Sequence, residues 1–235
     1  MIRSIIVSNL VPTLDFIFGF ADLHGLLDKK FDGFPYGISI GKKLEDKIVD
    51  GLEEGPTIEY YDHYCRINRE LTELTVRIQA DLERSGIESL ILPPTISFKV
   101  RGYEQYLEKL TYDLSHKMVA TRAGLGWIGK TDLFISEAFG PRLRLVTVLL
   151  KLDPGEVSVP VEESRCGKCN ICVVKCPAKA ANGKLWNTKV YRDEFFDAYK
   201  CREKCRELAK QRLNIEESIC GMCVCVCPKG GMVNR

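Results

Sequence analysis

Apolar residues recur at helical spacing over one long stretch of the chain. Six of them step by three and four between Tyr64 and Leu82, and Gly86 follows as a helix C-cap would. The spacing therefore predicts a long amphipathic helix that ends just before Gly86. Shorter helices are predicted over residues 44–52, 103–114 and 115–123.

Short apolar runs bounded by turn residues predict the strands. Pro93 and Pro94 stop one of these runs, because proline cannot continue a sheet ladder. Strands and helices alternate along this part of the chain, which predicts an α/β (α+β) layer fold with one sheet. The predicted strands cover residues 15–21, 36–41, 87–92, 133–136 and 143–150.

Cysteine spacing changes the picture in the last third of the chain. Ten of the eleven cysteines fall in the last 70 residues, and the run Cys166-x2-Cys169-x2-Cys172-x3-Cys176-Pro177 is typical of a bacterial ferredoxin holding a 4Fe-4S cluster. A shorter run, Cys220-x2-Cys223-x3-Cys227-Pro228, follows. In two-cluster modules the cysteine before the proline ligates the other cluster. We therefore predict a first cluster on Cys166, Cys169, Cys172 and Cys227.

The second cluster then takes Cys176, Cys220 and Cys223 and needs one more ligand. Cys201 and Cys205 lie four residues apart in a predicted helix over 193–208, so both project from one face. Spacing alone leaves the two open. The thiol that is not used, together with Cys65 and Cys225, is expected to be a buried or near-cluster cysteine rather than a nucleophile.

Other uses of cysteine fit the spacing less well. Structural zinc sites also pair C-x2-C units, but they rarely carry a C-x2-C-x2-C-x3-C-P run. Disulfides belong mainly to secreted chains, and the N-terminal residues have no signal-peptide pattern, so a reducing, cytoplasmic location is expected. No stretch approaches 18 uncharged apolar residues, so no membrane span is expected.

The cysteines also suggest a division into two domains. The segment 153–160 has linker composition, so we predict an α/β domain over 1–157 and a ferredoxin-like two-cluster domain over 158–235. Residues 1–150 carry 18 Lys and Arg against 21 Asp and Glu, whereas residues 151–235 carry 16 against 11. Thiolate-bound clusters are negative and offset this basic excess, so no nucleic-acid partner is expected.

A glycine-rich block at 124–131 satisfies two generic motifs. Gly-Leu-Gly-Trp-Ile-Gly-Lys-Thr fits both the dinucleotide pattern G-x-G-x-x-G and the P-loop pattern G-x-x-x-x-G-K-T. However, a helix-like segment precedes the block and a predicted strand follows it, which reverses the order of a P-loop. A nucleotide-dependent iron-sulfur protein is therefore only a remote alternative.

Several motifs together resemble the epoxyqueuosine reductases and reductive dehalogenases. These are His116-Lys117, the block 120–130, Phe139-Gly-Pro-Arg142 and the two cysteine runs, in this order. The resemblance covers residues 95–235. It implies an N-terminal domain that holds a cobalamin and a ferredoxin-like domain that delivers electrons to the cobalt. It also implies Cys201 as the remaining ligand, and a cofactor pocket at Gly124, Gly126, Trp127, Gly129 and Lys130.

The chain also departs from the epoxyqueuosine reductases. Their Asp-Tyr-His segment, the extra length before the glycine block and a tRNA-docking extension are not recognisable, so the chain looks like a short stand-alone branch and tRNA use is not expected. Two residues are catalytic candidates. His116 could bind cobalt or donate a proton, although histidines at helix ends are more often structural. Lys130 could place a positive charge beside a reduced cofactor, or simply flank a glycine turn.

Two functions compete. The first is an iron-sulfur oxidoreductase that passes single electrons through two clusters to a corrinoid or small-molecule acceptor in the N-terminal domain. The second is a non-catalytic electron-transfer partner that reduces another, corrinoid protein. Both need a redox donor of the ferredoxin or flavodoxin type.

Overall fold

The computed structural model describes residues 1–96 and 103–230 of the 235-residue chain. Its contacts divide the chain into two compact units, each built from three separate segments. The sheet unit consists of Met1–Lys43, Ile67–Leu125 and Arg144–Val161. The cysteine unit consists of Leu44–Arg66, Gly126–Leu143 and Glu162–Arg235, and it contains all eleven cysteines.

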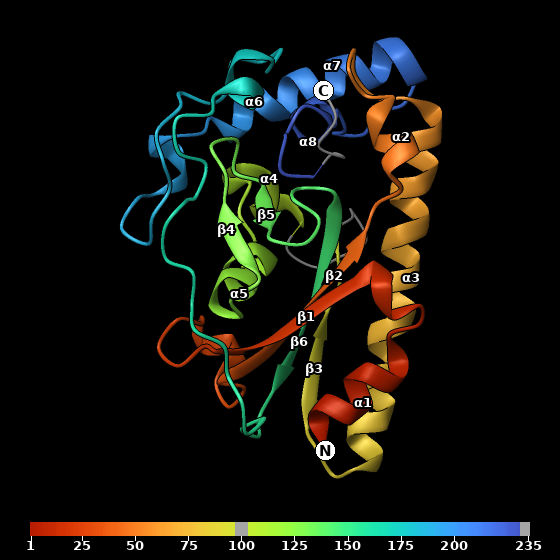
Figure 1. Cartoon of the computed structure of the whole chain (residues 1–235), viewed down its shortest axis with the longest axis vertical. Helices are drawn as coiled ribbons and strands as arrows, with labels where there is room; N and C mark the ends of the chain where they lie inside the picture. The colour runs from red at the N-terminus through yellow and green to blue at the C-terminus, as the bar shows by residue number, and fades with distance from the viewer. Residues whose placement is uncertain (97–102, 231–235) are drawn as a thin grey trace. The chain divides into compact units, whose positions relative to one another are not determined.

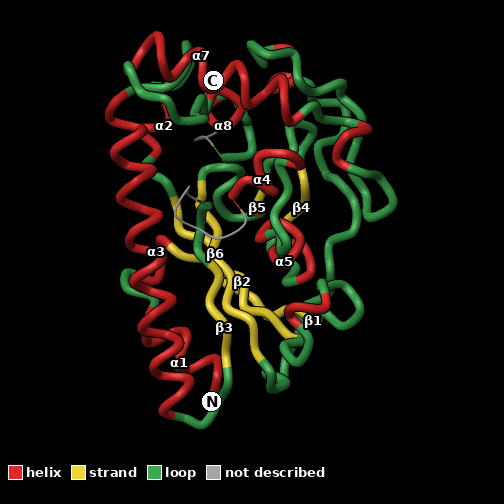
Figure 2. The backbone as a smooth tube through the Cα atoms, turned by 180° about the vertical axis from the view of Figure 1, so that it is seen from behind, coloured by secondary structure: helices red, strands yellow, loops and turns green. Residues whose placement is uncertain are grey.

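A four-stranded sheet forms the centre of the sheet unit, and Figure 2 shows its strands in yellow. The strand order is β1-β2-β6-β3. β1 pairs with β2 and β3 with β6, both antiparallel; Phe18 lies opposite Ile40, and Leu90 opposite Leu149. The strands are β1 Phe16–Asp22, β2 Tyr36–Lys43, β3 Ser89–Leu92 and β6 Leu143–Leu150.

Helices accompany this sheet on both sides. α5 (His116–Arg122) contacts β1 and β2, and Val119 and Ala123 bury their side chains there with Leu149 of β6. α1 (Ile2–Asn9) lies along the C-terminal part of α3 (Ile58–Arg84), where the Asn9 amide donates to Asp81 at 2.7 Å (Figure 1). α4 (Tyr103–Lys109) and two 3-10 turns, Thr13–Asp15 and Lys29–Phe31, complete the unit.

Among the described residues of the cysteine unit, the main regular elements are one hairpin, one long helix and the N-terminal part of α3 up to Arg66. The hairpin pairs β4 (Gly126–Ile128) with β5 (Phe134–Ser136), and the helix is α7 (Ala198–Leu213). Asp197 caps α7 by accepting from the Lys200 amide, and Asn214 ends it in the left-handed conformation, φ 56°. The remaining elements are α2 Asp46–Asp50, α6 Ile171–Val174, α8 Met222–Cys225 and a 3-10 turn, Arg192–Glu194.

Most predicted elements are confirmed, and the mixed α/β class with them. One prediction is wrong: the strand at 133–136 does not complete the large sheet but pairs with β4 in a sheet of its own. The predicted helix 103–114 is also too long, because α4 stops at Lys109 and Leu110 takes a positive φ of 47°. α1 and β4 were not predicted. β4 has only three residues and lies inside the glycine block, so it shows no strand pattern.

The segments of the two units alternate along the sequence, whereas the prediction had a single boundary after residue 157. Residues 44–66 and 126–143 pack with the C-terminal segment, although they precede the predicted linker. The linker prediction lies close to the last change between units, which follows Val161. In the described part of the chain, no helix is both long and apolar enough to cross a membrane.

Candidate functional site

Each cysteine run begins at a turn that leads into a one-turn helix. Gly167 has a φ of 54° and precedes α6, which carries Cys172, while Gly221 has a φ of 88° and precedes α8, which carries Cys223. Positive φ values suit glycine, because it has no side chain to clash. α6 and α8 contact one another, so the two runs lie together in the cysteine unit.

One group of four thiols forms around the end of the second run. Burial and the nearby thiols of Cys172, Cys166 and Cys169 together raise the pKa of Cys227 to about 11, although a hydrogen bond with the Lys229 backbone opposes this. These interactions reflect proximity, because charge interactions act over short range in a protein. The structure therefore brings together the four residues predicted for the first cluster.

A second group of thiols forms around Cys223, which is half-buried. Burial raises the pKa of this thiol, and Cys220, Cys201 and Cys176 add to the effect, with a smaller contribution from Cys172. The four residues predicted for the second cluster are thus also neighbours. The assignment of these eight thiols as cluster ligands stays a prediction.

Cys201 and Cys205 lie on consecutive turns of α7 with their sulfurs 3.8 Å apart. Cys205 shares hydrogen bonds with both Cys201 and Cys220, which raises its pKa, and Cys201 in turn raises the pKa of Cys223. Both thiols therefore reach the second group. Cys225 instead donates to the Asp50 carbonyl oxygen at 3.8 Å, and Cys65 is exposed.

The donor set suits iron-sulfur clusters. All eight predicted ligands are free thiols, seven of them half-buried and Cys169 exposed, in two groups of four. Four cysteine ligands are what each 4Fe-4S cluster needs. Within residues 1–96 and 103–230, no three His, Cys, Asp or Glu side chains converge closely enough to hold a single metal ion.

The glycine block packs against the chain itself. Gly124 has a φ of 70°, and a Cβ there would lie 2.8 Å from the Val159 carbonyl oxygen. A Cβ on Gly126 would lie 2.0 Å from the Ile135 carbonyl oxygen across the hairpin. Gly129 likewise faces the Ile135 side chain at 3.0 Å. The glycines are needed for this tight hairpin, and their predicted contact with a cofactor stays a prediction.

The two large side chains of the block point to the first cysteine run. Trp127, 1% exposed, donates from Nε1 to the Cys166 sulfur at 3.4 Å. Lys130, 3% exposed, donates from Nζ to the carbonyl oxygens of Gly167 and Cys169 at 2.9 and 3.0 Å, and to Asn170 Oδ1 at 2.7 Å. An ammonium group has three donors, so none remains for a phosphate. This geometry does not support the nucleotide alternative.

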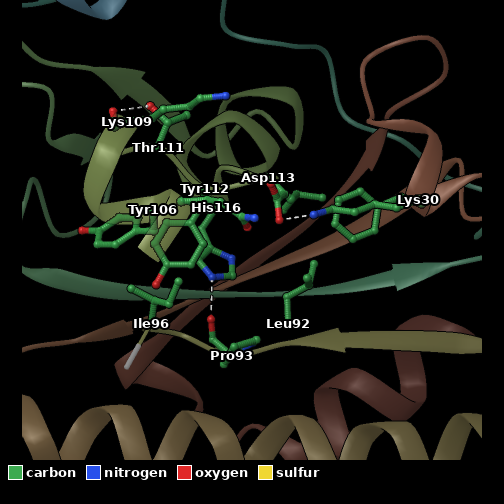
Figure 3. Close-up of a pocket in the computed structure, with 13 residues that line it drawn as sticks. Lys30, Leu92, Pro93, Ile96, Tyr106, Lys109, Thr111, Tyr112, Asp113 and His116 are labelled. Atoms are coloured by element: carbon green, nitrogen blue, oxygen red, sulfur yellow. Dashed lines mark hydrogen bonds and ion pairs between the residues drawn. The ribbon is translucent and has the colours of Figure 1, made fainter. Parts of the chain in front are cut away.

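The sheet unit contains a cavity of about 280 Å³ between β3, α4 and α5. Figure 3 shows that the rings of Tyr106, Tyr112 and His116 gather on one side of it, with Lys30 paired to Asp113 beside them. Its lining includes none of the five glycine-block residues predicted at a cofactor. The other lining residues are Phe31, Leu92, Pro93, Ile96, Gln105, Lys109, Thr111 and Leu114.

His116 is held in one orientation at the start of α5. Its Nε2 donates to the Pro93 carbonyl oxygen at 2.9 Å, and its Nδ1 lies 2.8 Å from the Thr147 hydroxyl, which donates to it. Burial lowers the pKa of His116 from 6.5 to about 4, although the Pro93 hydrogen bond opposes this. The ring is therefore neutral near pH 7, and it can line the cavity without adding charge.

Some contributors were not predicted. Tyr106 and Tyr112 line the cavity, and the only sequence signal for them was a tyrosine-rich segment. Asn170 accepts from Lys130, and its only sequence signal was its place as a helix N-cap. Thr131 hydrogen-bonds the Cys172 thiol, a contact that the sequence did not predict. His116 and Lys130, the two catalytic candidates, lie in different units.

Comparison with known proteins supports the family resemblance that the sequence motifs indicated. An epoxyqueuosine reductase of Lactococcus garvieae is 32% identical over 212 residues, which are 84% of this chain and 51% of that protein. The chain resembles epoxyqueuosine reductases over most of its length. A second one, from Listeria monocytogenes, is 35% identical over 126 residues, 50% of this chain and 30% of that protein. The chain thus spans about a third to half of the length of these relatives. No family model matches.

Solved structures share the fold at low sequence identity. An epoxyqueuosine reductase with a tRNA-Tyr epoxyqueuosine-modified stem loop has a TM-score of 0.61 at 16% identity, covering 97% of this chain and 64% of that one. A reductive dehalogenase, whose structure suggests a mechanism for B12-dependent dehalogenation, has a TM-score of 0.66 at 18% identity, covering 92% and 30%. The predicted resemblance to both groups is therefore confirmed at the level of fold.

Proposed function

We propose that the chain is an iron-sulfur oxidoreductase that passes single electrons through two 4Fe-4S clusters to an acceptor held by the sheet unit. The observation that carries this proposal is the grouping of eight free thiols into two sets of four. Each bound cluster would supply one-electron redox chemistry. Cys166, Cys169, Cys172 and Cys227 hold the first; Cys176, Cys201, Cys220 and Cys223 hold the second, in a ferredoxin-like domain.

The acceptor site is the cavity lined by Tyr106, Tyr112 and His116. Its volume, about 280 Å³, is slightly below the range for ligand pockets, roughly 300–1,000 Å³. It suits a small molecule, whereas a whole corrinoid needs more room than the described lining residues enclose. Direct binding measurements therefore decide whether the chain holds a cobalamin.

The residues that line the cavity position an acceptor and do not change their own charge beside it. His116 offers an uncharged ring face, because both of its nitrogens are engaged and its pKa is lowered. Lys30 and Asp113 neutralise each other in an ion pair at the rim. Tyr106 and Tyr112 line the cavity, and a phenol hydroxyl is able to give up a proton to a reduced acceptor.

Anaerobic reconstitution with iron and sulfide tests the redox proposal. Two clusters give about eight iron per chain, with visible absorption that bleaches on reduction. A protein that takes up only zinc would refute the proposal. Addition of cobalamin to the reconstituted protein, followed by gel filtration, then identifies the acceptor. Retained corrin absorption would assign a corrinoid, and its loss in His116→Leu would place it at the cavity.

The second candidate is an electron-transfer partner that reduces another, corrinoid protein. The small cavity favours it, because the chain then needs no large cofactor of its own. Failure to retain cobalamin, combined with reduction of a separate corrinoid protein by the reconstituted chain, would support this function. In both cases the electron donor is a ferredoxin or flavodoxin in a reducing, cytoplasmic environment.

The charge pattern of this chain and the structural relatives differ on whether RNA is a partner. One structural relative was solved with a tRNA stem loop, whereas the charge pattern here led us to expect no nucleic-acid partner. The chain matches only about half of the Lactococcus garvieae protein, so that protein's substrate does not transfer with it. Titration of the reconstituted protein with an epoxyqueuosine-modified stem loop decides the point; saturable binding at physiological salt would overturn our expectation.

A further inference from the structure

The β4–β5 hairpin and the loop between its strands contact the first cysteine run at three successive points. Trp127 donates to the sulfur of Cys166, Lys130 binds the loop that follows it, and Thr131 hydrogen-bonds the thiol of Cys172. All three hairpin side chains are buried, at 1%, 3% and 6% exposure. A short segment of five residues thus contacts the whole run from Cys166 to Cys172.

Lys130 fixes the backbone of this run. Its ammonium group donates to two carbonyl oxygens and one side-chain oxygen, all within 3.0 Å, inside a buried site. Buried ammonium groups are costly unless every donor is satisfied, so the loop and the lysine depend on each other. The same three bonds fix the turn at Gly167, where φ is 54°. The lysine therefore acts as a clamp on the loop.

Trp127 acts on a ligand atom itself. Its indole N–H lies 3.4 Å from the Cys166 sulfur, and two cations, Arg165 and Lys229, lie over its ring at 5.8 and 5.9 Å. Hydrogen bonds to cluster sulfurs stabilise the reduced, more negative state and so raise the reduction potential. The cations orient the ring through its negative face and add positive charge nearby.

We propose that Lys130 and Trp127 are positioning residues for the first cluster, with Lys130 clamping its ligand loop and Trp127 raising its reduction potential. This inference rests on the proposed function. It assigns a task to the P-loop-like sequence Gly-Lys-Thr at 129–131 that involves no phosphate. The lysine and threonine that would bind a nucleotide bind backbone oxygens and a cluster ligand instead.

Redox titration of the reconstituted protein, followed by electron paramagnetic resonance, tests Trp127. Trp127→Phe keeps the ring but removes the donor, so one of the two midpoint potentials becomes more negative while iron stays at about eight per chain. Trp186→Phe is the matched control, because it changes the only other tryptophan, and both potentials stay at the wild-type values. Unchanged potentials in Trp127→Phe would overturn the tuning role.

Iron content tests the clamp. Lys130→Met removes all three bonds, so the first cluster is lost and iron falls by about half, whereas Lys130→Arg restores part of it by keeping donors and charge. Circular dichroism of each variant checks that the fold is retained. Full iron in a folded Lys130→Met protein would refute the clamp. If the wild-type protein takes up no iron, the proposed function itself fails, which is a distinct result.

Discussion

His116 keeps a neutral ring because both of its nitrogens are hydrogen-bonded inside the sheet unit. Its Nε2 donates to Pro93, and its Nδ1 accepts from Thr147. Charging the ring would break the second bond and place a cation in a half-buried site. The residue type alone suggested a proton donor or a cobalt ligand, whereas its hydrogen bonds favour a positioning role.

This environment makes the stability of the protein pH-dependent. The pKa of His116 is about 4 when folded, against an ordinary value of 6.5, so the unfolded chain binds more protons between these values. Stability is therefore full above pH 6.5 and decreases as the pH falls toward 4. From pH 7.5 to 5.5 we expect a loss of about 1 kcal/mol, or about 2–4 °C in the thermal midpoint.

Thermal unfolding at one heating rate measures this loss. His116→Gln is the comparison variant, because glutamine can donate to Pro93 and does not titrate. Wild type and variant share His24 and His63, so the difference between their pH slopes isolates His116. Equal slopes for the two proteins would contradict the proposed neutral state.

The choice between Cys201 and Cys205 is a second prediction at this scale. The family resemblance implies Cys201 as the ligand, so we expect Cys201→Ser to lose the second cluster and retain about half of the iron. Cys205→Ser is its matched control, one helical turn away, and keeps about eight iron. The reverse pattern would assign the ligand to Cys205.

At the scale of elements, α7 shows how a local signal supports a distant site. Asp197 begins the helix by accepting from the Lys200 amide at 3.0 Å, and its own amide donates to the Ala180 carbonyl oxygen at 2.7 Å. The cap thus fixes the first turn of the helix, which carries Cys201. Helix termini leave unsatisfied amides that such a side chain stabilises.

Asp197→Ala should therefore weaken both the helix and the second cluster. Loss of an N-cap costs about 1 kcal/mol, which lowers the thermal midpoint by about 2–4 °C. We also expect faster iron release to a chelator, limited to half of the iron, because only Cys201 lies in the affected turn. Asp197→Ser retains a capping oxygen and should release iron as the wild type does. Equal iron-release rates for Asp197→Ala and Asp197→Ser would show that the N-cap has no effect on the second cluster.

Sequence patterns predicted the long elements better than the short ones. α3 and β6 have enough residues for their periodicity to be visible, and both were found where expected. The β4–β5 hairpin has arms of three residues, which show no period, and its glycines resemble phosphate-binding loops. Cysteine spacing predicted seven of the eight cluster ligands, because four-iron clusters constrain it, whereas the resemblance implied Cys201; the ligand assignment stays a prediction. Nothing in the spacing indicates that Lys130 faces carbonyl oxygens, since this depends on packing between segments distant in sequence.

At the scale of the whole molecule, each unit is assembled from three separated segments. Arg142 links the three segments of the cysteine unit. Its guanidinium, 3% exposed, pairs with Asp46 at 3.1 Å and Asp50 at 2.7 Å on α2, and it donates to the Cys225 carbonyl oxygen at 3.4 Å.

Arg142→Met should destabilise the protein more than the loss of any exposed ion pair. Removing one partner of a buried pair costs about 3–5 kcal/mol, but Asp46 and Asp50 are partly exposed, so we expect about 2 kcal/mol and a midpoint lowered by about 4–8 °C. Arg84→Met is the control: this arginine pairs with Asp81 on the surface, where such pairs contribute about 0–1 kcal/mol. Similar midpoints for the two variants would mean that the three segments are held together without Arg142.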